Sequence, residues 1–282
     1  MSEPKHLVHH VSDTALWAAI HRAKETDRPD AQFCDPFARR LAGDRGEQIA
    51  AGLAVAEADS WSWMARTWLF DNFIEEKVKQ GVDMVVNLGA GLDTRPYRTS
   101  WPAGLTWVEV DLPDILDYKE EILAADQPLV PLERIRLDLA DDVARRSLLK
   151  SLGSRATKVL ILTEGVLIYL TLEQAVTLSE DLAAVPAFNY WLVDIVSSGL
   201  LNLMKERTQN RISENAVLQF APPGGPEFFD AHGWRAADVQ SLLKTAGRLN
   251  RLPPEMQPFM NFPEDPVRMS QIPWGGVCLL EK

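Results

Sequence analysis

Cysteine is scarce in this sequence, and long apolar runs are missing. Cys34 and Cys278 are the two cysteines among 282 residues, and neither belongs to a C-x-x-C pair. A disulfide scaffold and a cysteine-based zinc site are therefore not expected. No stretch of about 18 apolar residues occurs, so we expect no membrane-spanning helix. The opening residues, MSEPKHLVHH, contain no apolar segment of the kind that directs secretion. These features predict a reduced, cytoplasmic location.

Positive charge is outnumbered as well. The chain carries 29 Lys and Arg against 40 Asp and Glu, a formal net charge of −11. Because nucleic acids and anionic membranes are bound by basic surfaces, we expect neither as a partner. Histidines are few and do not combine with acidic residues at the spacing of metal ligands, so no metal site is expected. A hydrophobic content of 46% is ordinary for a globular protein.

Helical patterns come first along the chain. Ser12–Ile20 has a polar start followed by apolar residues at helical spacing, and Asp35-Pro36 is typical of a second helix start. A long amphipathic helix is expected over Ser60–Val78, and Gly81 is the residue type that commonly ends a helix.

Short apolar runs then alternate with helical stretches. Strands are expected at 84–88, 106–111, 134–138, 159–163 and 190–195, with helices at 112–124, 141–149 and 172–184. This alternation predicts a doubly wound α/β sheet with parallel strands. The segment 199–229 interrupts the alternation, and we expect it to form an insertion over the carboxyl edge of the sheet. A helix over 238–246 and a strand over 277–280 complete the expected elements.

A glycine-rich turn follows the first expected strand. The sequence Asn87-Leu88-Gly89-Ala90-Gly91 lets the backbone approach a nucleotide-like ligand closely. Asp93-Thr94 follows where a dinucleotide-binding turn has a third glycine, so a dinucleotide would be held less well. The simpler alternative is a turn that only joins a strand to a helix.

Acidic residues stand at the ends of three further strands. Asp111 lies about 20 residues after the glycines, where a carboxylate accepts the hydroxyls of a ribose; alternatively it caps the following helix. Asp138 can accept from an adenine amino group, or serve as a cap or surface charge. Glu164 follows a fully apolar run, which predicts a place at the carboxyl tip of a central strand, where open α/β sheets bind ligands. Together with Gly89, these residues favour a nucleoside with an amino-acid tail over a dinucleotide.

In this order the motifs resemble those of class I S-adenosylmethionine-dependent methyltransferases, specifically the leucine carboxyl methyltransferase family with its bacterial small-molecule O-methyltransferase branch. The carrying segments are Asp13–Ala15, Phe33–Ala38, Ala65–Thr67, Asn87–Arg95, Glu109–Pro113, Asp138-Leu139 and Leu162–Leu170. The resemblance implies a Rossmann-like α/β fold: a mostly parallel seven-stranded sheet with helices on both faces, an N-terminal helical cap and the insertion at 199–229. We predict one domain, 1–282, divided into a cap with cofactor-gripping helices (1–80), a cofactor-binding core (81–198), a substrate-side insertion (199–229) and a C-terminal helix and strands (230–282).

The resemblance also implies which residues hold the methionine part of the cofactor, S-adenosylmethionine. Arg66 on the long helix and Arg22 nearer the N-terminus match the residues that grip the methionine carboxylate. For Arg22 the alternative is an exposed helix charge. Gly89 lines the methionine side, and Glu164 lies near the amino group.

For the nucleoside part, the resemblance assigns the ribose hydroxyls to Asp111 and the adenine to Asp138 and Leu139. Ala90, Gly91 and Leu112 complete the predicted cofactor-binding set.

The acceptor is less well defined by the sequence. Methyl transfer from a sulfonium is an in-line displacement, so the protein mainly aligns the nucleophile and excludes water. A carboxylate acceptor is already ionised, whereas a phenol or alcohol needs a base. Tyr169 and His232 are the two candidates for a catalytic role; their alternatives are a core residue and a loop residue.

We therefore expect an O-methyltransferase that acts on a small molecule, with a carboxylate favoured over a phenol or alcohol. The alternatives are a protein or peptide C-terminal carboxyl methyltransferase and a non-catalytic cofactor-binding protein. Five aromatic residues are expected either to line an acceptor pocket or to pack the cap onto the sheet: Trp17, Trp61, Trp63, Trp68 and Phe228.

Overall fold

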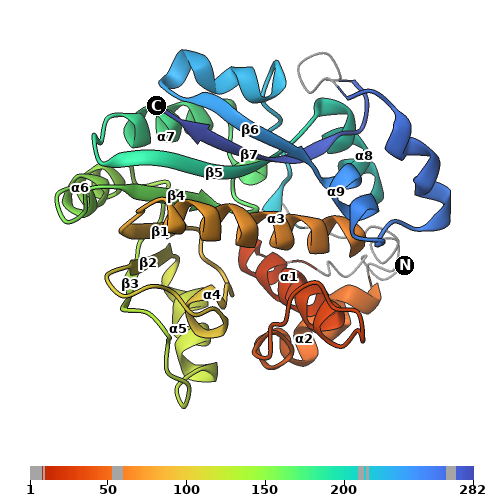
Figure 1. Ribbon diagram of the computed structural model, residues 1–282, viewed down its shortest axis with the longest axis horizontal. Helices are drawn as coiled ribbons and strands as arrows, with labels where there is room; N and C mark the ends of the chain where they lie inside the picture. The colour runs from red at the N-terminus through yellow and green to blue at the C-terminus, as the bar shows by residue number, and fades with distance from the viewer. Residues whose placement is uncertain (1–7, 9, 53–59, 209–212, 214–215, 265–270) are drawn as a thin grey trace.

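The computed structural model contains a seven-stranded sheet with helices on both faces (Figure 1). It describes residues 8, 10–52, 60–208, 213, 216–264 and 271–282. The strand order is β3-β2-β1-β4-β5-β7-β6. Neighbouring strands among β1 to β5 are parallel, and β7 runs antiparallel to both β5 and β6. The predicted α/β class and mostly parallel seven-stranded sheet are therefore confirmed.

The strands span β1 Met84–Leu88, β2 Thr106–Asp111, β3 Leu132–Arg136, β4 Val159–Thr163, β5 Phe188–Val196, β6 Arg235–Ser241 and β7 Gly275–Glu281. The α-helices span α1 Val11–Thr26, α2 Ala38–Gly52, α3 Ser60–Lys79, α4 Arg95–Arg98, α5 Pro113–Ile122, α6 Asp142–Gly153, α7 Leu172–Ala183, α8 Ser198–Thr208 and α9 Leu242–Arg248. The 3-10 helices of the described residues include η2 Leu167–Tyr169, η4 Gly225–His232 and η5 Pro254–Asn261. Among the helices within these described residues, none is long and apolar enough to cross a membrane.

Apolar residues on both faces of the sheet fix the layers. Every residue of β1 and β4 is buried, as expected for central parallel strands. The apolar side of α3, including Phe70 and Ile74, packs on one face, and α6, α7 and η4 pack on the other. Helix α3 runs across the front of the sheet in Figure 1, with α1 and α2 below it. The N-terminal helices thus lie against the edge where the parallel strands end.

The turn after β1 is tightly constrained. Gly89 has a φ of 70°, and its N–H donates to Val110 O at 2.8 Å, which ties the turn to β2. A Cβ on Gly89 would lie 2.5 Å from Val166 Cγ2. Because the turn needs both a positive φ and this close approach, glycine is required at this position. Strands β2 and β3 lie on one side of β1, and β4 and β5 lie on the other side. The turn after β1 therefore stands at the point where the strand order changes direction.

A buried ion pair between Glu109 and Lys119 links β2 to α5. Glu109 and Lys119 are both fully buried, with Lys119 Nζ 2.7 Å from Glu109 Oε1, and Arg134 Nε lies 2.8 Å from the other oxygen. Removing either partner would leave an uncompensated charge in the core, which is strongly destabilising. Glu109 therefore holds α5 and β3 to β2.

Two elements differ from the sequence prediction. The predicted helix over 238–246 is wrong in its first half, because 235–241 forms the edge strand β6 and the helix begins only at Leu242. Pairing with β7 decides this, and local periodicity does not report such pairing. The third strand covers 132–136 instead of 134–138, so Asp138 follows the strand and does not end it.

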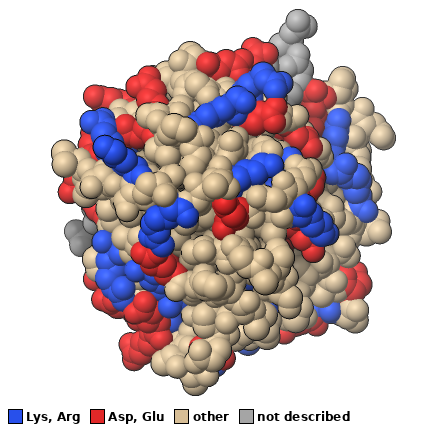
Figure 2. All heavy atoms as spheres, turned by 60° about the vertical axis from the view of Figure 1, so that its left-hand side comes forward, with Lys and Arg blue, Asp and Glu red and all other residues tan. Residues whose placement is uncertain are grey.

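Charged side chains of both signs are interspersed on the surface that Figure 2 shows. On this face acidic and basic side chains lie among one another and do not form a field of one sign.

Candidate active site

A cavity of about 1220 Å³ opens at the carboxyl ends of the parallel strands. Its walls come from the turns after β1 to β4, the end of β5, α1, α3 and α8, and the segment around η5. Typical small-molecule sites have volumes of roughly 300–1,000 Å³, so this cavity has room for more than one ligand. The walls contain six carboxylates and four guanidinium groups among the described lining residues.

Two arginines and two acids form the charged centre of this cavity. Arg66 on α3 donates from Nε to Glu164 Oε1 at 3.1 Å and from Nη1 to Asp194 Oδ2 at 3.2 Å. Arg95 donates from Nη1 to the second oxygen of Glu164 at 2.9 Å. Asp194 also accepts from the N–H of Gly165 at 2.6 Å. Both oxygens of each acid are therefore engaged.

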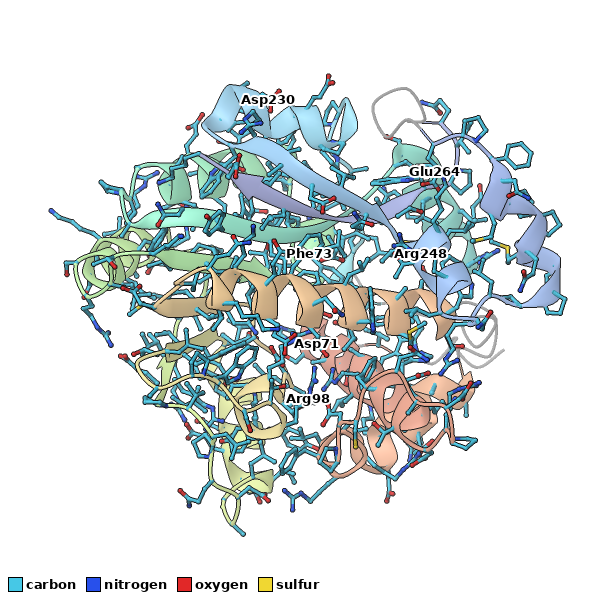
Figure 3. All side chains as sticks on the ribbon, viewed as in Figure 1. Asp71, Phe73, Arg98, Asp230, Arg248 and Glu264 are labelled. Carbon is cyan, nitrogen blue, oxygen red and sulfur yellow. The ribbon has the colours of Figure 1, made fainter. Side chains whose placement is uncertain are left out.

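The pairing continues behind the cavity wall. Arg95 contacts Asp93 at 2.9 Å and Asp71 at 2.5 Å, and Arg98 contacts Asp71 at 2.7 Å. In Figure 3, Asp71 on α3 and Arg98 lie next to each other below the helix. We call the full set the arginine cluster: Arg66, Arg95, Arg98, Asp71, Asp93, Glu164 and Asp194. It joins α3, the turn after β1, α4, β4 and β5.

Burial and pairing set the ionisation of these groups. Burial alone would raise the pKa of Asp93, but the Arg95 guanidinium outweighs it and lowers the pKa to about 2. For Asp194 burial is the larger effect, and its pKa is raised although Arg66 is adjacent. Arg95 keeps its charge, because Asp93, Glu164 and Asp71 raise its pKa against the effect of burial.

Asp111 stands at the end of β2 with its carboxylate on the glycine turn. Oδ2 accepts from the N–H of Gly91 at 2.6 Å, and Oδ1 accepts from the N–H of Leu112 at 2.7 Å. Burial raises the pKa of Asp111. A carboxylate offers about four acceptor positions, so two remain for further donors. The alternative that Asp111 caps the following helix is wrong, because α5 has Leu112 as its N-cap residue and no side-chain cap hydrogen bond. The role of Asp111 as a ligand acceptor stays a prediction.

Asp138 and Leu139 line the same cavity as Asp111 and Leu112. Asp138 Oδ1 accepts from the N–H of Ala140 at 2.9 Å, which fixes the turn after β3. The cavity thus brings together the ends of four strands, as the sequence predicted. Gly89, Ala90, Gly91 and Glu164 line it as well.

Arg22 lines the cavity but is held by protein groups. Its Nε donates to Asp35 Oδ2 at 2.8 Å, and its Nη2 donates to Leu92 O at 2.6 Å. Only 12% of its side chain is exposed, so the alternative of an exposed helix charge is wrong. Arg22 fixes the loop after the glycine turn to α1.

The two candidates for a catalytic role lie in different places. Tyr169 lines the cavity, and burial raises the pKa of its hydroxyl, which interacts with Thr14. His232 does not belong to the cavity wall; it ends η4, with Nδ1 3.1 Å from Glu180 Oε1. The hypothesis of His232 as a base is therefore not supported by its position.

The predicted aromatic pocket is present in part. Trp17, Trp61 and Trp63 line the cavity, and Arg66 lies 4.7 Å from the ring centroid of Trp63. Trp68, on α3, packs against α9, and Phe228 packs on the ring of Phe229 in η4. These last two are packing residues and not part of the cavity wall.

Asp194 and Arg95 were not among the site residues predicted from the sequence. Arg95 stands inside the recognised motif, and Asp194 stands near the end of a predicted strand. The rule that selected Glu164, an acid after an apolar run, could have selected Asp194 as well.

Comparisons with known proteins identify the family of this chain. The family model for leucine carboxyl methyltransferase matches residues 15–183. A predicted S-adenosyl-L-methionine-dependent methyltransferase of Parafrankia sp. (strain EAN1pec) is 34% identical over 87% of this chain and 84% of its own length. A second one, from Mycobacteroides abscessus, is 31% identical over 84% of this chain and 89% of its own.

Solved structures share the fold. A predicted methyltransferase from Thermobifida fusca YX superposes with a TM-score of 0.57 at 17% identity, over 87% of this chain and 92% of that one. A DUF574 family protein from Streptomyces avermitilis gives a TM-score of 0.56 at 13% identity, over 95% and 97% of the two chains.

The fold, the cavity at the strand ends and these relatives define an S-adenosyl-L-methionine-dependent methyltransferase. Within that class, the chain belongs to the leucine carboxyl methyltransferase family. The catalytic interpretation is thus favoured over a non-catalytic cofactor-binding protein.

The residues present fit the cofactor. A Cβ on Gly89 would collide with Val166, whereas glycine leaves the space beside the turn open to a ligand. The excess of carboxylates over guanidiniums in the cavity suits a ligand with positive sulfonium and ammonium groups. We expect Arg66 and Glu164 to take the two charges of the methionine part and Asp111 the ribose. When bound, S-adenosyl-L-methionine supplies an activated methyl group on a positively charged sulfur.

Replacing Asp111 tests the nucleoside end of the site. We expect Asp111→Ala to weaken binding of S-adenosylhomocysteine about 10- to 100-fold, because hydrogen bonds to a charged acceptor contribute roughly 1.5–3 kcal/mol. Isothermal titration calorimetry measures this. Asp114→Ala removes an exposed acid three residues away that does not line the cavity, and it serves as the control. Equal affinity in all three proteins would contradict the assignment.

The depressed pKa of Asp93 predicts how stability depends on pH. Because its folded pKa of about 2 lies below the ordinary 3.8, its contribution is present above pH 4 and is lost as the pH falls towards 2. Asp93→Asn should therefore lower the free energy of unfolding by about 2 kcal/mol at pH 7, and the difference from wild type should shrink below pH 4. Urea unfolding at several pH values measures it, and a difference that is constant with pH would refute the ion-pair account.

Proposed function

We propose that this methyltransferase transfers the methyl group to a carboxylate oxygen of a small molecule. The observation that supports the proposal is that the acids at the charged centre of the cavity are already bound by arginines and backbone N–H groups. In-line transfer to a hydroxyl needs a group that accepts its proton, whereas a carboxylate is ionised at neutral pH. An acceptor that arrives ionised suits a cavity without a poised base.

The described groups nearest the charged centre are poorly suited to act as a base. Protonating Glu164 or Asp194 would cost its ion pair with Arg66. Tyr169 has a raised pKa, so its hydroxyl keeps its proton at neutral pH. The described lining residues include no histidine and no cysteine.

The shape of the cavity supports a small acceptor. Its outer part is lined by apolar side chains of α8, α9 and η5, among them Leu203, Leu242 and Met256. These walls exclude water from the reacting groups and hold an acceptor by apolar contact. The fixed backbone around Gly89 and the paired arginines keep the opposite wall rigid, so alignment of the acceptor is the main contribution of the protein.

One cation stands where an acid would enter. Arg207 lines the cavity from the last turn of α8 and is exposed, so it lies at the mouth. A positive charge at the entrance of a cavity with excess acids attracts an anionic acceptor and raises the rate of encounter.

Transfer of a labelled methyl group to a panel of small acids, phenols and proteins tests the proposal. We expect label on a small acid, released by mild base as expected for a methyl ester. A base-stable product would indicate an ether and a hydroxyl acceptor. Label on a protein band would support the alternative of a protein or peptide carboxyl methyltransferase.

Arg207 gives a second test with a matched control on the same helix. Arg207→Gln should lower kcat/KM for an acidic acceptor about 3- to 10-fold at low ionic strength, with the difference fading at high salt. Lys205→Gln removes an exposed charge of α8 outside the cavity wall and should leave kcat/KM unchanged. If both variants behave alike, or if the salt dependence is absent, the acceptor is not recognised by its negative charge.

A further inference from the structure

Exposed apolar side chains gather at the mouth of the cavity. Seven large hydrophobic residues are exposed in the described part of the chain, and Phe259, Phe262 and Ile272 are 48%, 59% and 54% exposed. All three line the cavity, and the two phenylalanine rings lie 5.8 Å apart. We call these three residues the apolar rim. Single exposed hydrophobics are ordinary, but a group around one opening marks a binding surface.

Apolar side chains of α8 line the cavity together with the rim. Leu200, Leu203 and Met204 line the cavity from one face of the helix, and the charged Arg207 follows on the same face. Along α8 these apolar side chains extend for about 6 Å, from Leu200 to Met204. Met256 on η5 lines the cavity near Phe259 in the chain. One apolar surface therefore leads from the interior to the rim.

The acid closest to the rim in the sequence is already engaged. Glu264, labelled in Figure 3, follows Phe262 by two residues and lies near α8 and α9. Its Oε1 accepts from Ser241 Oγ at 2.9 Å, and Lys244 Nζ is 3.8 Å from Oε2. The Glu264 carboxylate is thus bound by Ser241 and Lys244 at the start of α9. A ligand at the rim would therefore contact the apolar side chains.

The apolar rim is continuous with the reaction cavity, and this continuity indicates which ligand covers the rim. An occupant of the rim that also fills the apolar passage must reach the wall that carries Gly89 and Glu164. The acceptor meets that condition, because its reacting oxygen has to lie at that wall.

We propose that the acceptor is an amphiphilic acid, with its carboxylate inside the cavity and a large apolar body that extends along α8 and η5 to the rim. This inference rests on the proposed function and specifies its substrate class. It excludes short, fully polar acids as the preferred acceptors, since they would leave the passage and rim in water.

Binding of straight-chain alkanoates from butanoate to dodecanoate tests the inference. Isothermal titration calorimetry would use the full chain saturated with S-adenosylhomocysteine. We expect affinity to rise roughly two- to fourfold per added methylene, since each buried methylene contributes about 0.8 kcal/mol. The double variant Phe259→Ser/Phe262→Ser should lose about 10-fold or more in affinity for dodecanoate and little for butanoate. Val143→Ser removes a 79% exposed apolar side chain on α6 and should change nothing.

Three results would overturn the inference: affinity that does not rise with chain length, a rise that the double variant keeps, or rim variants that change only the oligomeric state. The last result would assign the rim to contact between copies of the chain. Failure of the proposed function looks different. In that case dodecanol binds as well as dodecanoate, or bound alkanoates receive no labelled methyl group while another class of acceptor does.

Discussion

Buried charge is the constraint on which the site depends. The arginine cluster holds three guanidiniums and four carboxylates where α3, α4, β4 and β5 meet. A charge removed from water is tolerated only if it is paired and hydrogen-bonded, so each member fixes the position of its neighbours. Glu164 shows this most clearly, since Arg66 holds one of its oxygens and Arg95 the other.

The inner and outer walls of the cavity therefore have different roles. The inner wall is charged and rigid, and its excess of acids suits the positively charged cofactor of the family. The outer wall is apolar and partly exposed, and it suits the body of an acceptor. Because the inner acids are committed to arginines or backbone N–H groups, the chemistry we propose requires an acceptor that is already ionised.

Much of the inner wall could be predicted from the sequence. The runs 84–88, 106–111 and 159–163 are short and strongly apolar, and the structure has strands at the same positions. Parallel strands place their carboxyl ends at one edge, so Gly89, Asp111 and Glu164 were expected to come together, and they do. The motif resemblance then indicated the cofactor.

The partners of these residues could not be predicted. Arg66 is 98 residues from Glu164 and 128 from Asp194, and no local pattern reports such pairings. Edge strand β6 was mistaken for helix because its pairing with β7 is also long-range. The apolar rim comes from η5 and the approach to β7, segments whose place at the cavity depends on the tertiary fold.

The central claim is that the cavity beside the arginine cluster holds the cofactor. A crystal structure of the protein with S-adenosylhomocysteine tests it most directly. The account predicts the amino-acid tail against Arg66 and Glu164, the ribose hydroxyls on Asp111, and the adenine beside Asp138 and Leu139. A nucleoside bound elsewhere, or one bound here with its tail directed to the apolar rim, would contradict it.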